Sequence, residues 1–191
     1  MTAEPRNAAV DYPGGIRVRF RWAGSGAGAA VFALTESGGA LTDHGPLVSA
    51  GYERMCRAEL RVETPVGPWT ARLAAPLFDD PAALLWDSEG MLVVKYGFTT
   101  YGFDARGGDL RWTHRSGSPI LVVLGSSRLP HVIVQAEVET FALAADGEVS
   151  WRVAHSDVVI EAELVGGRLI LTSYGGLLTA LDPRTGLTAT S

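Results

Sequence analysis

The sequence predicts an all-β fold built from stacked antiparallel sheets. The first observation is a phrase that recurs three times in the second half of the chain: a short apolar run, a turn that holds glycine, and a returning segment. Its central apolar residue is Phe103, then Leu143, then Leu181, at spacings of 40 and 38 residues. The second observation is that short apolar runs bounded by turn residues fill the chain, while helical patterns are nearly missing. Because repeats near 40 residues are typical of propeller blades, we expect a β-propeller of roughly four to five four-stranded blades.

The first 75 residues follow this pattern least regularly. Residues 1–14 are expected to form an N-terminal tail. Clear alternation follows at Ile16–Trp22, where apolar side chains take one face of a strand and Arg17, Arg19 and Arg21 take the other. Since the later spacing is irregular, residues 15–75 form either β-rich N-terminal blades or a separate small β unit. Further apolar runs predict strands at residues 29–35, 58–63 and 69–74, and the two weak helix patterns lie at residues 52–60 and 81–85.

Residues 76–191 predict three consecutive blades. The inner and second strands of each blade are nearly continuous in apolar residues, as sheets buried on both faces require. The expected strands are residues 82–86, 91–96, 99–104 and 109–114; then 120–125, 131–136, 140–144 and 148–153; then 158–164, 168–173, 177–181 and 187–190.

The recurring phrase predicts a tight hairpin between the third and the outer strand of each blade. Its glycine, which is Gly108, Gly147 or Gly186, can take a positive φ without steric cost. An aspartate at the start of the turn can accept hydrogen bonds from backbone amides two residues on. We expect Trp112 and Trp151 to hold equivalent places on the outer strands and to pack against the next blade, because a buried indole contributes a large contact area.

The phrase resembles the repeat of quinoprotein-type β-propellers, whose blades end in Ala-Leu-Asp, two or three residues, Thr-Gly and then Trp. Residues 180–186 match this pattern best, whereas the middle copy has Ala144 in the aspartate position and the last copy has Thr190 where a tryptophan would fall. The resemblance covers about residues 76–191. It implies a blade and not an activity, because propellers host many unrelated functions.

Composition and motifs argue against several classes of function. The formal net charge is −5, whereas a nucleic-acid or anionic-membrane surface shows a basic excess. The single cysteine, Cys56, excludes an internal disulfide and a cysteine-based zinc site. The histidines lack zinc-ligand spacing, and no Gly-x-Ser-x-Gly or phosphate-loop motif occurs. We therefore predict no catalytic, metal-binding or cofactor-binding residue and no cofactor. Without a signal-peptide core or a membrane-spanning run, we expect a cytoplasmic location.

These observations predict a non-catalytic scaffold that binds a protein partner. The candidate contacts are the aromatic residues Phe98, Tyr101 and Tyr174, each beside a glycine, because aromatic side chains on loops supply much of the energy at interfaces. The arginine face of residues 17–21 is a second candidate, suited to an acidic partner. The alternatives are a small-ligand-binding propeller and a fragment of a quinone-dependent oxidoreductase. To close the ring, either residues 16–22 lie near the last blade or a second subunit completes it.

Overall fold

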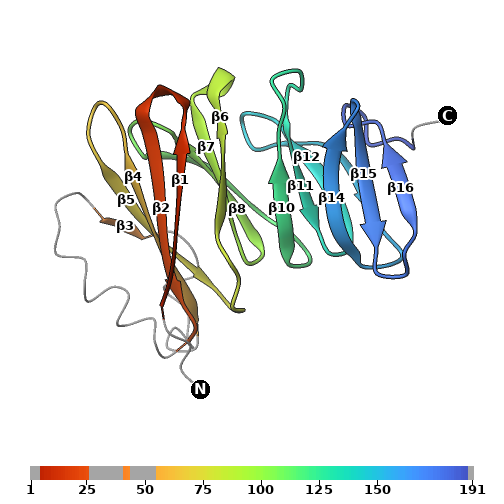
Figure 1. Cartoon of the computed structure of the whole chain (residues 1–191), viewed down its shortest axis with the longest axis horizontal. Coiled ribbons are helices and arrows are strands. Elements are labelled where there is room, and N and C mark those ends of the chain that lie inside the picture. The colour runs from red at the N-terminus through yellow and green to blue at the C-terminus, as the bar shows by residue number, and fades with distance from the viewer. Residues whose placement is uncertain (1–4, 26–40, 44–54, 189–191) are drawn as a thin grey trace.

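Four β-sheets stand side by side in a row along the molecule (Figure 1). The computed structural model describes residues 5–25, 41–43 and 55–188. In the first sheet the strands are ordered β1-β2-β4-β5-β3, and every pair is antiparallel except β3 with β5. Its strands are β1 (Arg6–Tyr12), β2 (Ile16–Ala23), β3 (Leu41–Asp43), β4 (Cys56–Glu63) and β5 (Trp69–Ala75).

The other three sheets are antiparallel meanders. The second sheet consists of β6 (Ala82–Trp86), β7 (Met91–Tyr96), β8 (Thr99–Asp104) and β9 (Leu110–Arg115). The third sheet consists of β10 (Ile120–Leu124), β11 (Val132–Ala136), β12 (Glu139–Leu143) and β13 (Val149–Ala154). The last sheet consists of β14 (Val159–Val165), β15 (Arg168–Ser173) and β16 (Leu178–Leu181), with one further bridge between Leu181 and Thr188.

The expected strands of residues 76–188 are confirmed, but the outer strand of the last blade is reduced to that single bridge in the described part of the chain. Both weak helix patterns are wrong: β4 includes residues 56–60, and β6 includes residues 82–85. A short apolar run cannot distinguish a helix turn from a strand, and here neighbouring strands decide. Residues 29–35 lie outside the described residues.

The prediction of an N-terminal tail is wrong for Arg6–Tyr12, which forms strand β1. β1 pairs with β2 along its whole length, from Arg6 opposite Trp22 to Tyr12 opposite Ile16. A short 3-10 turn at Pro13–Gly15 reverses the chain between the two strands. β1 is exposed along nearly all of its length, so its sequence carries no apolar stripe that would predict a strand.

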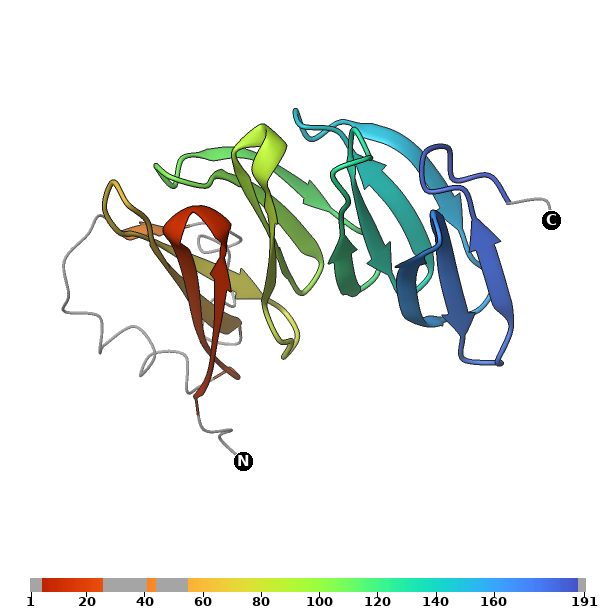
Figure 2. The ribbon, with the colours of Figure 1, turned by 45° about the horizontal axis from the view of Figure 1, so that its top comes forward.

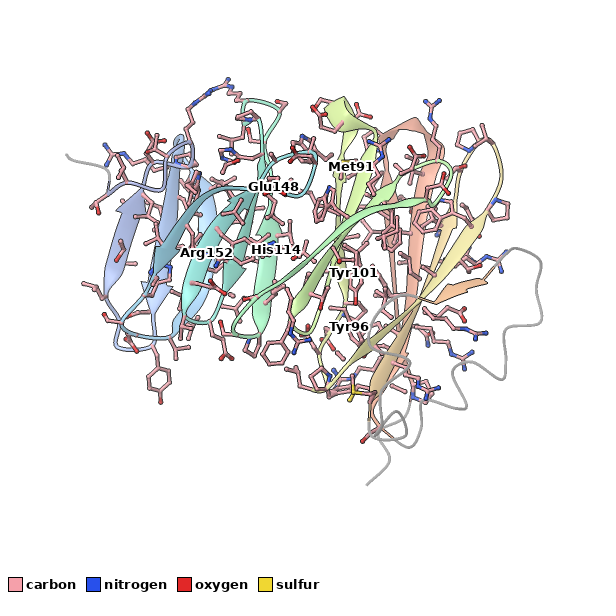
Figure 3. The ribbon with its side chains drawn as sticks, turned by 180° about the vertical axis from the view of Figure 1, so that it is seen from behind. Met91, Tyr96, Tyr101, His114, Glu148 and Arg152 are labelled. Carbon is pink, nitrogen blue, oxygen red and sulfur yellow. The ribbon has the colours of Figure 1, made fainter. Side chains whose placement is uncertain are left out.

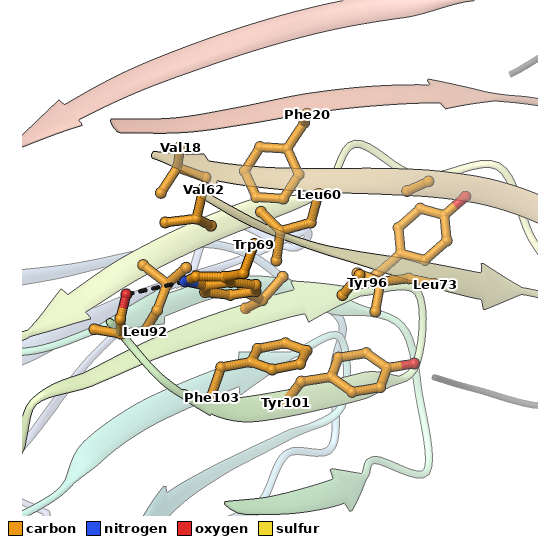
Figure 4. Close-up of a cluster of buried hydrophobic side chains, with 14 of the residues drawn as sticks. Val18, Phe20, Leu60, Val62, Trp69, Leu73, Leu92, Tyr96, Tyr101 and Phe103 are labelled. Atoms are coloured by element: carbon orange, nitrogen blue, oxygen red, sulfur yellow. Dashed lines mark hydrogen bonds between the residues drawn. The ribbon is translucent and has the colours of Figure 1, made fainter. Parts of the chain in front are cut away.

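Three apolar clusters fill the spaces between successive sheets. The largest lies between the first and second sheets and includes Phe20, Leu60, Trp69 and Phe103 (Figure 4). A second cluster joins the second and third sheets, and a third joins the third and last sheets. Each interior sheet is therefore buried on both faces, whereas within the described residues the first and last sheets pack against another sheet on one face only.

In each of the first three sheets, a tryptophan on the fourth strand of the sheet order, β5, β9 or β13, links the sheet to the next one. The Trp69 indole N–H donates to the carbonyl of Ala105 at 3.2 Å, and the Trp112 indole N–H donates to that of Ala145 at 3.0 Å (Figure 4 draws the first of these bonds). Trp112 and Trp151 occupy equivalent places, each next to the bulge at which its own strand, β9 or β13, skips one residue in its pairing with the third strand. The predicted position and packing of both tryptophans are thus confirmed.

The glycines of the recurring turn lie directly under these indoles. Gly108, Gly147 and Gly186 follow one another at intervals of 39 residues and all have positive φ, between 72° and 86°. A Cβ atom built on any of them would lie 2.5 to 2.6 Å from the nearest atom of Trp69, Trp112 or Trp151, respectively. The turn therefore requires glycine for two reasons, its backbone conformation and the close approach of the indole.

The sheets form an open arc within the chain. The first and last sheets lie at opposite ends of the molecule, as two views show (Figures 1 and 2). Residues 16–22 pair with β1 and β4 and do not lie near the last sheet, so the prediction that they close the ring directly within this chain is wrong.

No helix in the described ranges has the length and apolar character needed to cross a bilayer.

Candidate functional site

The predicted contact residue Tyr101 is fully buried, so its assignment to a partner surface is wrong. It lies in the middle of β8, opposite Val94, and points into the core between the first and second sheets (Figures 3 and 4). Its ring centroid is 6.1 Å from that of Phe103, and burial raises the pKa of its hydroxyl to about 12. The neighbouring Gly102 suggested a loop, but this glycine instead leaves room for the Trp112 ring.

The other two aromatic candidates occupy corresponding turns. Phe98 lies in the turn between β7 and β8 and is half-buried beneath the guanidinium of Arg115, 5.5 Å from the ring centroid. Tyr174 lies in the turn between β15 and β16 and is 80% exposed. Each turn joins the second and third strands of its sheet, so the two residues belong to the same edge of the arc (Figure 1).

The third sheet presents an apolar side chain in the same turn. Val138, between β11 and β12, is 41% exposed, and Leu177, which follows Tyr174 in the last sheet, is 67% exposed. We call Phe98, Val138, Tyr174 and Leu177 the rim surface. Sequence reasoning missed Val138 and Leu177, although the repeat register that aligns the turns could have revealed both.

Carboxylates from the segments that connect successive sheets hold the rim turns in place. Asp79 accepts hydrogen bonds from the backbone N–H of Gly97 at 2.8 Å and from Lys95 Nζ at 2.9 Å. Asp157 accepts from the backbone N–H of Gly175 at 2.9 Å and from that of Val158 at 2.8 Å. The N–H of Gly175 contributes most to holding the pKa of Asp157 below its usual value. The turns of the second and last sheets are therefore fixed in similar ways.

In the third sheet the arrangement is reversed, because Glu139 at the start of β12 binds the segment that connects β9 to β10. Its carboxylate accepts from the Ser116 hydroxyl at 2.7 Å and from the backbone N–H of Gly117 at 2.8 Å. The backbone N–H groups of Ser116 and His155 complete the edge by donating to the carbonyls of Phe98 and Val138, respectively. Hydrogen bonds along the edge of three sheets thus hold the turns that carry the rim surface.

The three predicted arginines lie on the outward face of the first sheet. Ile16, Val18, Phe20 and Trp22 of β2 enter the core, so Arg17, Arg19 and Arg21 point the other way, as the alternation predicts. We call these three residues the arginine face. Arg17 pairs with Asp11 at 3.2 Å and Arg19 with Glu63 at 3.4 Å, and both arginines remain about half exposed.

The titratable side chains that the structure describes serve mainly local structure. His131 is buried, and its Nε2 lies 2.8 Å from the carbonyl oxygen of Pro183. The hydroxyl of Thr140 lies 2.6 Å from Nε2 of His155, whose pKa is lowered by burial. Across the described ranges, no three His, Cys, Asp or Glu side chains gather in a way that could hold a metal ion.

His114 belongs to a small cluster on the outer strands. Its ring packs on Phe141, with centroids 4.8 Å apart, and its Nε2 lies 3.1 Å from a nitrogen of Arg152 (Figure 3 labels His114 and Arg152). Burial, together with the positive charge of Arg152, lowers the pKa of His114. The cluster joins β9 to β13 and offers no nucleophile beside the histidine.

Comparison with known proteins supports the fold. No protein-family model matches the chain, and no curated protein matches it. Among solved structures, the computationally designed Ika8 protein matches 95% of the chain with a TM-score of 0.55 at 10% identity. The dihydro-heme d1 dehydrogenase NirN, in complex with DHE, matches 97% with a TM-score of 0.53 at 16% identity. BamB from Moraxella catarrhalis matches 60% with a TM-score of 0.45 at 17% identity.

The likenesses to Ika8 and NirN, together with the sheet topology, confirm the fold class. The protein is all-β, and its antiparallel sheets are blades of the kind found in β-propellers. The matched region spans 59% of the Ika8 chain, 47% of the NirN chain and 38% of the BamB chain, less than two thirds of each.

Proposed function

We propose that this protein is a non-catalytic scaffold that binds a protein partner through the rim surface. The observation that carries the proposal is that the corresponding turns of three successive sheets each end in an apolar side chain. Two of these residues, Tyr174 and Leu177, expose most of their surface to solvent. Aromatic anchors on loops of a rigid frame supply much of the energy at protein interfaces, and apolar neighbours such as Leu177 help to exclude water around them.

The rigidity of the turns supports the proposal. Asp79 and Asp157 bind backbone N–H groups of the turns, and Glu139 ties the start of β12 to the segment before β10, so little conformational entropy remains to be lost when a partner binds. A binding surface whose shape exists before the partner arrives gains affinity from this preorganisation. We propose a protein partner rather than nucleic acid or membrane because the chain carries a net charge of −5. The proposed location is the cytoplasm.

We also propose that the repeat belongs to the quinoprotein type. The Asp104 carboxylate accepts from the backbone N–H groups of Arg106 and Gly107, and Asp182 accepts from that of Arg184, as the Asp-containing turns of that repeat require. In the middle copy, where Ala144 replaces the aspartate, Asp146 accepts from the backbone N–H of Glu148 instead. This kinship concerns blade construction and carries no enzyme activity into the proposal.

The proposal is tested by native mass spectrometry of the protein purified from its own host. We expect a stoichiometric protein partner that the double variant Tyr174→Ala/Leu177→Ala loses, while its melting temperature stays unchanged. The matched control is Val66→Ala/Leu187→Ala, which removes exposed apolar side chains from the turns at the opposite edge. This control should keep the partner.

Three outcomes would contradict the proposal. If the rim variant binds the partner as tightly as the wild type does, the rim surface is not the binding site. A small molecule released on denaturation in place of a protein would indicate a small-ligand-binding propeller. Absorbance of a bound quinone would indicate a fragment of a quinone-dependent oxidoreductase.

A further inference from the structure

No sheet in the described part of the chain packs on the outward face of the last sheet. Register shows which side chains form it: Glu161 lies opposite Thr172, Glu163 opposite Ile170, and Val165 opposite Arg168. On β16, Leu178 and Ala180 continue the first two of these rows. We call this surface, centred on Glu161, Glu163, Val165, Ile170 and Leu178, the glutamate face.

The corresponding positions of the interior sheets show that this surface suits burial. Counted back from the turn between the second and third strands, Ile170 corresponds to Val93 and Ile133. Val93 and Ile133 are fully buried against the following sheet, whereas Ile170 is half-buried. Val165 and Leu178, at 55% and 68% exposure, extend the apolar surface on either side of Ile170. Covering them would remove substantial apolar area from water.

The charges of the glutamate face and of the arginine face are complementary. Glu161 and Glu163 are exposed, and neither forms an ion pair with any residue in the described ranges. They are two residues apart on β14, just as successive arginines of the arginine face are two residues apart on β2. Both rows therefore repeat every ~7 Å along their strands. In aligned sheet packing, rows with the same repeat can meet residue for residue.

The glutamate face and the arginine face, which we call the two end faces, both lack the contact of an indole with a turn glycine that joins successive sheets. The turn between β4 and β5 of the first sheet contains Gly67, and a Cβ atom built on it would meet nothing within 4 Å, so no indole covers it. The last copy of the repeat has Thr190 in place of tryptophan in the sequence. The two end faces thus match each other both in the charges they carry and in the link they lack.

We infer that the glutamate face of one copy packs on the arginine face of a second copy, and that two such head-to-tail contacts close a ring. The contact buries Val165, Ile170 and Leu178 and sets Glu161 and Glu163 against arginines. The ion-pair partners that the described residues offer to Arg17 and Arg19 are the exposed Asp11 and Glu63. Exposed pairs contribute little to stability, so both arginines can change partner at small cost. The rim surface lies at the edge of the sheets and stays accessible, so the inference does not depend on the proposed function.

The test is a charge exchange between the two faces, read by sedimentation velocity. The wild type is expected to form a species of twice the 20.2 kDa mass, and dimer formation should weaken as salt concentration rises. The variant Glu161→Arg/Glu163→Arg and the variant Arg19→Glu/Arg21→Glu should each associate with themselves at least ~100-fold more weakly, because like charges then face each other. An equimolar mixture of the two variants should restore the dimer, since one contact has exchanged charges and the other is wild type.

The control Glu89→Arg/Glu148→Arg changes two exposed acids outside both faces and should dimerise like the wild type. Each variant is first checked for a wild-type circular dichroism spectrum. If a charge-reversed variant does not fold, Glu161→Gln/Glu163→Gln replaces it and should also weaken dimerisation. A wild type that is monomeric at every concentration, a dimer that withstands both exchanges, or a mixture that stays monomeric would each overturn the inference.

Discussion

The third sheet is joined to each of its two neighbours by an indole that packs over a turn glycine, but the two indoles differ in burial and in hydrogen bonding. On one side, Trp112 is buried, its indole N–H is bound to Ala145, and the turn that it covers leads into a full outer strand. On the other side, Trp151 is half-buried, no described group accepts its N–H, and His131 contacts the carbonyl of Pro183 in the turn beneath it. A repeat that has neighbours on both faces is therefore packed more completely than one at the end of the array.

The largest expected difference concerns the two indoles themselves. Trp112→Ala should lower the free energy of unfolding by about 4 kcal/mol, because a buried aromatic ring and its cavity are involved, and Trp151→Ala by about half as much. Denaturant titration of the two variants beside the wild type measures both losses. Equal losses would show that the two links contribute alike and would break the comparison.

The glycine beneath each indole offers a second test. Gly147→Ala should lower stability by about 3 kcal/mol, since φ is +86° and the new Cβ would meet Trp112. Gly166 also has a positive φ but nothing within 4 Å of a Cβ, so Gly166→Ala should cost only about 1 kcal/mol. Thermal melts of the two variants separate the effect of the indole from that of the backbone. Similar shifts in melting temperature would remove the indole from the explanation.

A smaller effect isolates the indole hydrogen bond. Trp112→Phe removes the bond to Ala145, whereas Trp151→Phe removes none that the described residues provide. Trp112→Phe should therefore cost about 1 kcal/mol more than Trp151→Phe, which is the usual net contribution of one hydrogen bond. Denaturant titration would again decide, and a larger loss for Trp151→Phe would argue against the assigned roles.

The smallest expected effect is the loss, at acid pH, of the stabilisation that Asp157 gives to the turn between β15 and β16. Because the pKa of Asp157 is lowered in the folded protein, its contribution to stability is present above the ordinary pKa of about 3.9. This contribution is lost as pH falls through the lowered value. The hydrogen-exchange protection factors of the turn between β15 and β16, which correct for the intrinsic slowing of exchange in acid, should therefore fall below about pH 4 in the wild type. Asp157→Asn should lower these protection factors at neutral pH and leave less further change in acid, and unchanged protection at neutral pH would contradict the role of the carboxylate.

Sequence reasoning succeeded where the signal is local and repeated. The glycine turns and Trp112 with Trp151 recur at a period that the chain itself displays, so their places could be predicted. Trp69 has the same role 43 residues before Trp112, but the irregular first sheet hid it. Strand β1 could not be predicted because it is exposed and lacks an apolar stripe.

The candidate site was harder to predict because exposure depends on neighbouring sheets. Tyr101 and Tyr174 both stand beside glycine in the sequence, yet one is fully buried and the other is 80% exposed. The difference arises from position: Tyr101 lies within a strand covered by the first sheet, and Tyr174 lies in a turn at the edge. Only the arrangement of strands distinguishes the two.

The central claim is that neighbours on both faces stabilise a sheet and that the last sheet, with a described neighbour on one face, opens before the interior sheets. Hydrogen exchange measured by mass spectrometry on dilute protein tests it most directly. We predict that β7 and β11 exchange only through global unfolding, whereas β15 and β16 exchange earlier, through opening of the last sheet alone. Equal protection of β7, β11, β15 and β16 would contradict the claim.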